Sequence, residues 1–234
     1  MSREAASREA LYDSKTEQYF SGVRHDMLER LSTGPDSAIA EVGCGDGATG
    51  AAALERGKAG HYTGFELMPE VAAIARPRLS EVITGNVETM DLSRFAGKFD
   101  ALIMSEVIEH LSDPWSTLET LLACLKPDGE VIASSPNIAH RNVLANLLAG
   151  KFEYADAGVM DRTHLRWFTP ASYHALFERA GCRDIKVMPV RTPSRLPRLF
   201  NRLTSNRYAH LSMTQIMIHA RAPQQLNSRT VRGA

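Results

Sequence analysis

The sequence predicts an α/β fold built on a mostly parallel β-sheet. From Ile39 onward, short apolar runs alternate with longer amphipathic stretches, a pattern typical of strands joined by crossover helices. Seven such runs occur in the 234 residues, enough for one full sheet. The candidate strands are Ala38–Val42, Tyr62–Glu66, Val82–Thr84, Ala101–Ser105, Val131–Ser134, Ile185–Val190 and Met213–His219.

Amphipathic segments between these strands predict the helices. They lie near residues 48–57, 69–79, 114–125 and 170–180. Two of them have clear stop signals. The run Lys126-Pro127-Asp128-Gly129 predicts a turn after Leu125, and Gly181 predicts a C-cap after Ala180.

Two regions depart from the simple alternation. Residues 1–37 predict an N-terminal amphipathic helix that ends at Gly34-Pro35. Residues 137–169 predict an insertion after the fifth strand, beginning with a helix from Asn137 to Leu148. Ligands of open parallel sheets bind beyond the carboxyl ends of the strands, so the insertion is expected to form a lid. The main domain is then expected to span 38–222, followed by a flexible tail at 223–234.

Composition excludes several classes of protein. With 44% hydrophobic and 23% charged residues and a mean hydropathy of −0.22, neither a disordered nor a fibrous chain is expected. No apolar run approaches the roughly 20 residues of a membrane-spanning helix, and the polar N-terminus does not resemble a signal peptide. These features predict a cytoplasmic protein. The three widely spaced cysteines, Cys44, Cys124 and Cys182, predict neither a disulfide framework nor a zinc knuckle.

The formal net charge of zero conceals an uneven distribution. All 27 acidic residues lie at or before Asp184, and nine of the 27 basic residues follow it. The basic segment 191–207 could contact a phosphorylated acceptor, an anionic lipid surface or RNA. The favoured interpretation is that it pairs with the acidic body of its own chain or of a partner subunit in a homodimer. The neutral composition of the whole chain argues against a protein that coats nucleic acid generally.

The most informative stretch is the glycine loop Glu41-Val42-Gly43-Cys44-Gly45-Asp46-Gly47. Glycines after a strand let the backbone turn tightly and approach a ligand closely. The loop could hold the pyrophosphate of a dinucleotide, but Glu41 and Asp46 would repel that anion. They suit a cationic ligand such as S-adenosylmethionine, which carries a sulfonium and an ammonium group. Glu66, at the end of the second strand, could accept hydrogen bonds from a ribose.

Together these motifs resemble class I S-adenosylmethionine-dependent methyltransferases over roughly residues 36–190. The matching stretches are E-V-G-C-G-D-G, the acid closing the second strand, G-N-V-E, S-E-V-I-E-H-L and L-K-P-D-G-E. The resemblance implies a Rossmann-like seven-stranded sheet with the last strand antiparallel and helices on both faces. It also implies binding of S-adenosylmethionine, with S-adenosylhomocysteine as product.

The resemblance assigns cofactor-binding residues one by one. Glu41, Gly43, Cys44 and Gly45 would lie at the methionine moiety, with Cys44 as a small spacer; Glu66 and Leu67 at the ribose; Asn86 and Val87 at the adenine; Ser105 and Glu106 near the methyl group. The family commonly has Asp where this chain has Asn86. The carbonyl of Asn86 can still accept from the adenine amino group, so binding is expected to survive.

His110 is the best-placed candidate for a catalytic base. It follows the fourth strand by a few residues, where the active site of such enzymes opens, and a hydroxyl acceptor must lose a proton during methyl transfer. The alternative is that His110 caps or packs locally. Glu106, Glu109 and His110 could also bind a metal ion, but the sequence contains no second acidic cluster, so no metal is predicted.

The stretch D-R-T-H-L-R-W-F-T, with the Ser-Pro-Asn after the fifth strand, resembles bacterial methyltransferases of surface-glycan and natural-product pathways. In it, His164, Arg162 and Arg166 could contact a polar or anionic acceptor. They could equally tether the insertion to the domain through ion pairs.

The favoured function is O-methylation of a hydroxyl on a small molecule or sugar precursor. The alternatives are N- or C-methylation, a catalytically silent nucleotide-binding regulator, and an NAD-dependent oxidoreductase. Enzymes that methylate amino groups of nucleic-acid bases resemble one another in an Asn/Asp-Pro-Pro-Tyr/Phe motif, and this chain has Ser105-Glu106-Val107-Ile108 at that place. Methylation of nucleic-acid bases is therefore disfavoured.

Overall fold

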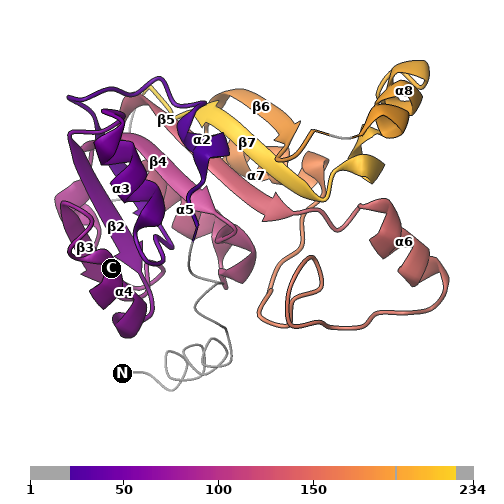
Figure 1. Cartoon of the computed structure of the whole chain (residues 1–234), viewed down its shortest axis with the longest axis horizontal. Helices are drawn as coiled ribbons and strands as arrows, with labels where there is room; N and C mark the ends of the chain where they lie inside the picture. Colours follow the sequence, from indigo (N-terminus) through magenta and orange to yellow (C-terminus); the bar gives the residue numbers. More distant parts are fainter. Residues whose placement is uncertain (1–21, 193, 225–234) are drawn as a thin grey trace.

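The computed structural model describes residues 22–192 and 194–224. They form one seven-stranded sheet in the order β3-β2-β1-β4-β5-β7-β6 (Figure 1). All neighbouring strands are parallel except that β7 runs antiparallel to both β5 and β6. The strands are β1 Ala38–Val42, β2 His61–Glu66, β3 Glu81–Thr84, β4 Phe99–Ser105, β5 Leu125–Pro136, β6 Arg183–Pro189 and β7 Gln215–Arg221. The predicted sheet, with its last strand antiparallel, is confirmed.

The fifth strand differs from its prediction. The structure has no turn that separates Leu125 from the strand; β5 runs through the Lys-Pro-Asp-Gly stretch. Its pairing with β4 shifts register between Leu125 and Glu130, and Asp128 has a positive φ of 61°. The residues that predicted a turn therefore form an irregularity within the strand.

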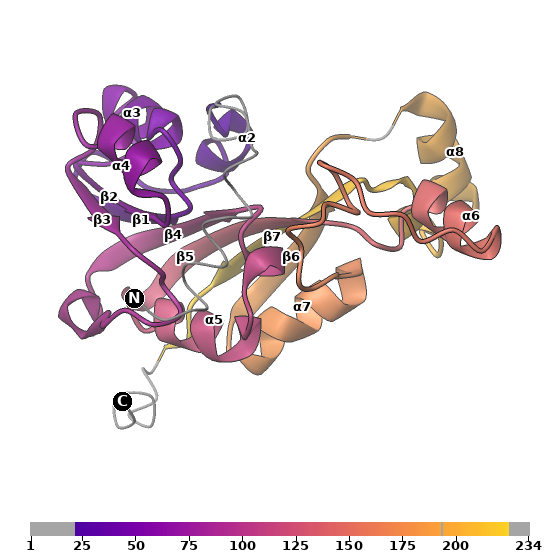
Figure 2. The ribbon, with the colours of Figure 1, turned by 90° about the horizontal axis from the view of Figure 1, so that it is seen from below.

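Helices cover both faces of the sheet (Figure 2). The helices α2, α3 and α4 lie on one face, and α5 and α7 lie on the other. Each layer encloses a hydrophobic core: Tyr62, Ala53 and Ala75 belong to one, and Leu118, Tyr173 and Phe177 to the other. The bounds are α2 His25–Leu28, α3 Ala48–Glu55, α4 Pro69–Ala75, α5 Pro114–Leu122, α6 Arg141–Leu148, α7 Pro170–Arg179 and α8 Arg195–Leu203, with short 3-10 helices η2 Ser93–Phe95, η3 Ile108–His110 and η4 Ala209–Ser212.

The N-terminal helix is shorter than predicted within the described residues. Helix α2 ends at Leu28 and does not continue to Gly34. Its buried side chains, Met27 and Leu28, pack into the same core as Leu31 beyond the helix. Tyr19 and Phe20, predicted to lie on this helix, fall outside the described residues, as do 225–234 of the predicted tail.

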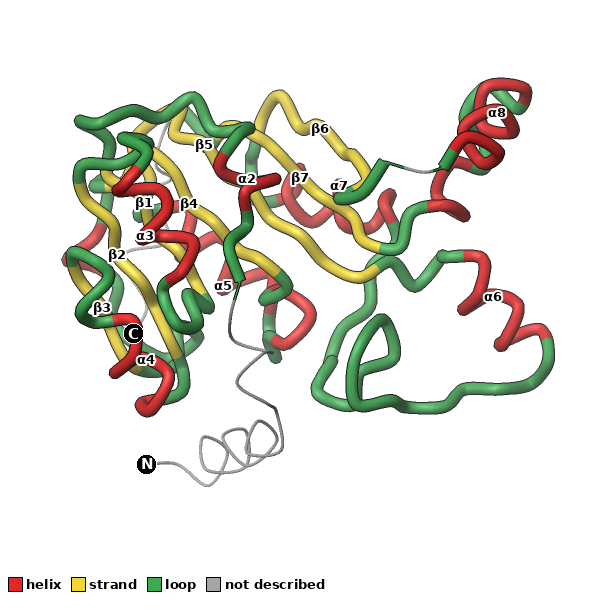
Figure 3. The backbone as a smooth tube through the Cα atoms, in the orientation of Figure 1, coloured by secondary structure: helices red, strands yellow, loops and turns green. Residues whose placement is uncertain are grey.

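The insertion after β5 extends beyond the edge of the sheet as a long loop that carries α6 (Figure 3). Helix α6 begins at Arg141, not at the predicted Asn137. The reason is that Asn137 is held by the chain before β7: its side-chain amide donates to the carbonyl oxygens of His210 and Met213, each at 2.7 Å. This anchors the start of the insertion beside the carboxyl end of the sheet.

Helix α8, between β6 and β7, was not predicted. It has Leu196 and Leu203 on its exposed surface, 80% and 77% exposed, among three basic residues, Arg195, Arg198 and Arg202. No helix in the described ranges has the length and apolar character needed to cross a membrane.

Candidate functional site

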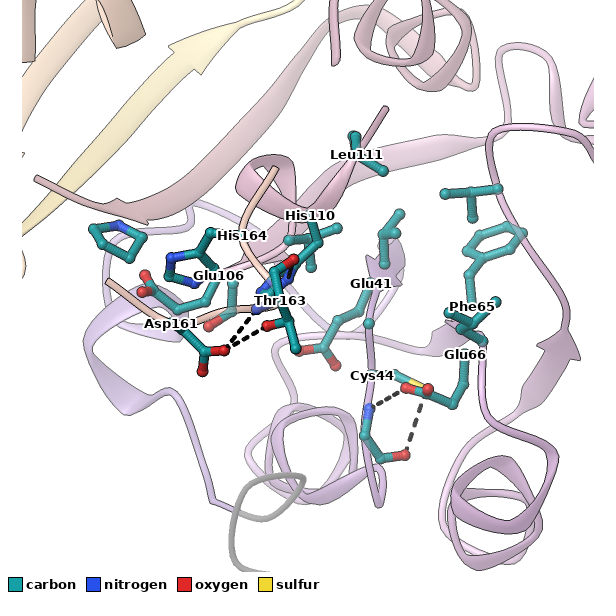
Figure 4. Close-up of a pocket in the computed structure, with 18 of the residues that line it drawn as sticks. Glu41, Cys44, Phe65, Glu66, Glu106, His110, Leu111, Asp161, Thr163 and His164 are labelled. Carbon is teal, nitrogen blue, oxygen red and sulfur yellow. Dashed lines mark hydrogen bonds between the residues drawn. The ribbon is translucent and has the colours of Figure 1, made fainter. Parts of the chain in front are cut away.

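A cavity of about 910 Å³ opens at the carboxyl ends of the central strands. Its walls come from the glycine loop after β1, from the ends of β2, β3 and β4, from the η3 region and from the insertion (Figure 4). A cavity of this size is in the range that holds a cofactor together with part of an acceptor. Every cofactor-binding residue predicted from the sequence lines it: Glu41, Gly43, Cys44, Gly45, Glu66, Leu67, Asn86, Val87, Ser105 and Glu106.

The glycine loop places open backbone against the cavity. Gly43 has a φ of +69°, and a Cβ at that position would lie 2.8 Å from Cγ2 of Val107. Gly45 has a φ of +55°, and its N–H donates to Oε2 of Glu66 at 2.9 Å. The loop is therefore fixed to the end of β2, in a conformation that suits glycine.

Glu41 is a buried carboxyl group at the base of the cavity. The hydroxyl of Tyr62 donates to its Oε2 at 2.9 Å. Burial raises the pKa of Glu41 to about 8, although the Tyr62 hydrogen bond and the Arg24 guanidinium oppose that shift. A cation bound beside Glu41 would favour its charged form.

Asp46 does not have the predicted role. Its carboxylate forms an ion pair with Arg78 at 2.7 Å and accepts from the N–H of Ala48 at 3.0 Å, at the start of α3. Its charge is therefore neutralised by Arg78 on the outside of the loop. Among the acids of this region, Glu41 and Glu66 are the ones that line the cavity.

The residues that follow β2 and β3 have partly local roles. Glu66 accepts from the N–H of Met68 at 3.0 Å through Oε1, and burial raises its pKa. Oδ1 of Asn86 accepts from the N–H of Glu88 at 2.9 Å. The carbonyl that was expected to meet the adenine thus already stabilises the turn, although an oxygen atom can accept a second hydrogen bond.

Ser105 and Glu106 end β4 in a constrained arrangement. The Arg24 guanidinium donates to Oγ of Ser105 and, at 3.2 Å, to Oγ of Ser134. Glu106 has a positive φ of 54° and accepts from the side-chain amide of Gln215 at 3.0 Å. Burial raises the pKa of Glu106. Such backbone conformations in a non-glycine residue are concentrated at functional sites.

His110 and His164 come from distant parts of the sequence and lie side by side (Figure 4). Their ring centroids are 4.8 Å apart. Nδ1 of His110 lies 3.1 Å from the carbonyl oxygen of Thr163, and Nδ1 of His164 lies 3.1 Å from the carbonyl oxygen of Val159. Both histidines line the cavity, so the structure brings the two predicted candidates together.

The insertion is tied to η3 through the backbone of Glu109. The carbonyl oxygen of Glu109 accepts from the N–H groups of Leu165 and Arg166 at 2.8 and 3.0 Å. Asp161 holds the turn before His164, because its Oδ1 accepts from the N–H and the hydroxyl of Thr163 at 2.9 and 2.8 Å. These bonds place the insertion over the end of β4.

Arg162 and Arg166 are not brought into the cavity. Arg162 forms an exposed ion pair with Asp156 at 2.9 Å. Arg166 donates to the carbonyl oxygen of Ser112 and lies over the ring of Trp115, 5.9 Å from its centroid. Arg166 thus ties the insertion to the chain that follows η3, although not through an ion pair, whereas the ion pair of Arg162 lies within the insertion and tethers it to nothing else.

Several residues of the site could not be recognised from the sequence. Gln215 and Thr214 line the cavity from the start of β7, and no local motif marks them. Arg24 also lines the cavity, and the sequence predicts for it only a place on the N-terminal helix. The signal for Asp161 and Thr163 was present, because an Asp-x-Thr pair commonly forms a hydrogen-bonded turn.

The cavity fits S-adenosylmethionine better than a dinucleotide. The glycine loop offers backbone at close range, and the two acids that line the cavity beside it, Glu41 and Glu66, have raised pKa values. A cationic ligand would stabilise their charged forms, whereas a pyrophosphate would be repelled by those forms and would gain no ionic attraction from the neutral ones. The residues present thus match the charge of a sulfonium cofactor.

Comparison with known proteins gives the same result. A family model described as "Methyltransferase domain" matches residues 12–187. The ubiquinone biosynthesis O-methyltransferase of Aeromonas salmonicida is 26% identical over 165 residues, 68% of each chain. A similar relative in Xylella fastidiosa is 28% identical over 132 residues, 54% of this chain and 52% of the relative.

Solved structures share the fold. A SAM-dependent methyltransferase from Archaeoglobus fulgidus has a TM-score of 0.60 at 19% identity, covering 88% of this chain and 97% of the other. A SAM-dependent methyltransferase from Thermotoga maritima has a TM-score of 0.63 at 17% identity, covering 93% and 100%. With the family model matching most of its length, this chain belongs to the methyltransferase domain family and is a class I S-adenosylmethionine-dependent methyltransferase.

Proposed function

We propose that this enzyme transfers the methyl group of S-adenosylmethionine to a hydroxyl of a small molecule or sugar precursor in the cytoplasm. The observation that carries the proposal is the position of His110 in the cavity wall. Because Nδ1 of His110 is held by the Thr163 carbonyl oxygen, the neutral ring carries its proton on Nδ1. Nε2 then has the lone pair that a general base needs.

The cofactor-binding residues are proposed to hold the two ends of the cofactor. Glu41 and the Gly43–Gly45 backbone would bind the methionine moiety, with Cys44 as a spacer, and Glu66 and Leu67 would lie at the ribose. Asn86 and Val87 would lie at the adenine, and Ser105 and Glu106 beneath the methyl group. This order follows the strand ends around the cavity.

The chemistry asked of the protein is alignment and proton removal. The bound cofactor supplies an electrophilic methyl group, and in-line displacement transfers it to the acceptor oxygen. The proton of the hydroxyl would pass to Nε2 of His110. His164, whose ring lies beside that of His110, would position the acceptor.

The insertion 137–169 is proposed to act as a lid. It contributes Gly158, Val159, Asp161, Thr163, His164 and Leu165 to the cavity wall. Its attachment to Glu109 lies next to His110, so acceptor binding and closure of the insertion would be coupled. A closed lid would exclude water from the methyl group.

Oxygen as the acceptor atom has a second support. The curated relatives described above are named O-methyltransferases, but at 26% and 28% identity their names do not fix the acceptor here. An amine acceptor, which needs no comparable base, is the main alternative.

A product assay tests this proposal. The protein is incubated with S-adenosylmethionine and three acceptor panels, phenols, sugars and primary amines, and products are identified by mass spectrometry and NMR. The expected result is an O-methyl product together with S-adenosylhomocysteine. Products methylated only on nitrogen or carbon would overturn the O-methyl assignment, and failure with every hydroxyl panel member in a protein that binds S-adenosylhomocysteine would count against transferase activity on such hydroxyls.

The basic segment 191–207 is proposed to contact an acidic surface of a second copy of the chain. Within the described residues, Arg191, Arg195, Arg198, Arg202 and Arg207 form no ion pair. Pairing with the acidic body of the same chain is therefore not supported. Residues 1–184 have nine more acids than bases, which gives a second copy the complementary charge.

A further inference from the structure

We propose that Glu109, His110 and His164 form a binding site for one divalent transition-metal ion. One ligand atom of each residue lies within 4.8 Å of the others. Ligand atoms on one zinc ion lie about 2 Å from the metal and up to about 4 Å apart. The three ligand atoms therefore lie close to the spacing that a shared ion requires.

The two histidines are oriented as metal ligands usually are. Each places Nδ1 at 3.1 Å from a backbone carbonyl oxygen, His110 at Thr163 and His164 at Val159. Metal-binding histidines typically donate one ring N–H to such an oxygen, which fixes the tautomer and presents the other nitrogen to the metal. The lone pair of Nε2 is then the coordinating one in both rings.

Glu109 supplies the negative charge. Its side chain is 1% exposed, and within the described residues neither carboxylate oxygen has a hydrogen-bond partner of ordinary geometry. Burial of a carboxyl group without a partner is costly, so such groups call for an explanation. A cation between Glu109 and the two imidazoles would supply a positive counter-charge, which the neighbouring Ser135 hydroxyl cannot.

Two imidazoles and one carboxylate suit a particular group of metals. Imidazole nitrogen favours Zn²⁺, Fe²⁺, Co²⁺ and Ni²⁺ over Mg²⁺ and Ca²⁺, which prefer oxygen ligands. Three protein ligands leave at least one coordination position open. Because His110 and His164 line the cavity, that position would face an acceptor oxygen.

The metal site would add a role for a bound ion to the proposed methyl transfer. Binding of the ion itself does not depend on that function. In the metal-loaded protein, Nε2 of His110 holds the ion and is not available as a base. A bound ion would instead lower the pKa of a coordinated hydroxyl directly. The role of the ion in methyl transfer rests on the proposed function, whereas ion binding is measurable in its absence.

Metal titration of the untagged, chelator-treated full chain tests the site. Zn²⁺ is titrated by calorimetry, and Co²⁺ is followed by its visible d–d absorption, which reports nitrogen and oxygen ligation. The expected result is one ion per chain. Glu109→Gln and His164→Gln should each weaken binding at least about 100-fold and reduce the Co²⁺ bands.

His174→Gln is the matched control, because His174 lies on α7 beside Glu178 and is not part of the cluster. It should leave the affinity unchanged. Residues 1–21 and 225–234 contain neither His nor Cys, so the imidazole and thiol ligands of the chain all lie in the described ranges. If one cluster variant fails to fold by circular dichroism, the other decides.

Two outcomes would overturn the site: no binding of Zn²⁺ or Co²⁺, or equal affinity in the wild type and the folded cluster variants. S-adenosylhomocysteine binding, measured in parallel, should be retained in every variant. If the wild type does not bind S-adenosylhomocysteine, the proposed cofactor site is contradicted, but the result of the metal titration is unaffected.

Discussion

Glu41 links the electrostatics of the cavity to cofactor affinity. Its pKa is raised to about 8 by burial, so below that pH the ligand-free protein holds the carboxyl group protonated. A bound sulfonium or ammonium group favours the carboxylate. Affinity for S-adenosylmethionine should therefore rise with pH, by up to about tenfold per unit below pH 8, and then level off. Calorimetry between about pH 6 and pH 9 measures the effect.

Glu41→Gln is the control for that titration, because it should bind the cofactor more weakly at pH 9 and lose the slope. The ligand-free protein should show the opposite trend in stability. The folded pKa of about 8 lies above the ordinary value of 4.5, so the free energy of unfolding should fall as pH rises between them. If the cofactor affinity of Glu41→Gln still rises with pH, another group is responsible for that pH dependence.

His110 is the residue on which catalysis is proposed to depend. His110→Gln should lower turnover by about 100-fold or more and leave cofactor affinity nearly unchanged, because the histidine acts on the acceptor side. Steady-state kinetics with S-adenosylmethionine and the best acceptor checks the loss, and His174→Gln should keep wild-type rates. An unchanged rate in His110→Gln would remove the residue from the mechanism.

At the scale of elements, the insertion 137–169 is predicted to become more resistant to cleavage when both ligands bind. Limited proteolysis at residues 150–165 should slow several-fold with S-adenosylhomocysteine and acceptor present together, since Leu165 and Arg166 are hydrogen-bonded to Glu109 beside His110. Cleavage rates are read by gel and mass spectrometry. A rate indifferent to both ligands would contradict closure.

Helix α8 provides a prediction about association. The variant R195Q/R198Q/R202Q should weaken self-association, and salt should weaken it in the wild type, because Coulombic attraction between exposed charges is screened. Sedimentation at low and high ionic strength measures both. A mass that is the same in all four conditions would rule out a charge-driven dimer.

The elements show what the sequence could predict. The Ala38–Val42 strand has the same bounds in the structure, because a buried parallel strand is a short apolar run with glycine after it. The Lys-Pro-Asp-Gly stretch pairs with neither β4 nor β7, as its turn residues suggest, but local propensity could not show that Leu125 before it already pairs with Phe99 of β4. Helix α8 was missed since its exposed leucines follow no core-facing pattern.

The candidate site was predictable in part. The residues after each strand end line one cavity because parallel strands end at one edge. The pairing of His110 with His164 was not predictable, because it depends on how the insertion folds back onto Glu109. The proposed metal site therefore depends on the structure, which brings His164 to Glu109 and His110. From the sequence, Glu109 and His110 alone did not predict a metal ion.

At the scale of the whole molecule, one cavity joins the strand ends to the insertion. The cofactor should lie across β1 to β4, with its sulfur turned toward the two histidines at the boundary with the insertion. Charge is divided in the same molecule, with an excess of acids in residues 1–184 and nine bases but no acid after them.

A crystal structure with S-adenosylhomocysteine tests this claim most directly. The ribose is expected at Glu66, the amino-acid end beside Gly43 and Gly45, and the sulfur facing His110. S-adenosylhomocysteine bound elsewhere, or a ligand whose sulfur faces away from His110 and His164, would contradict it.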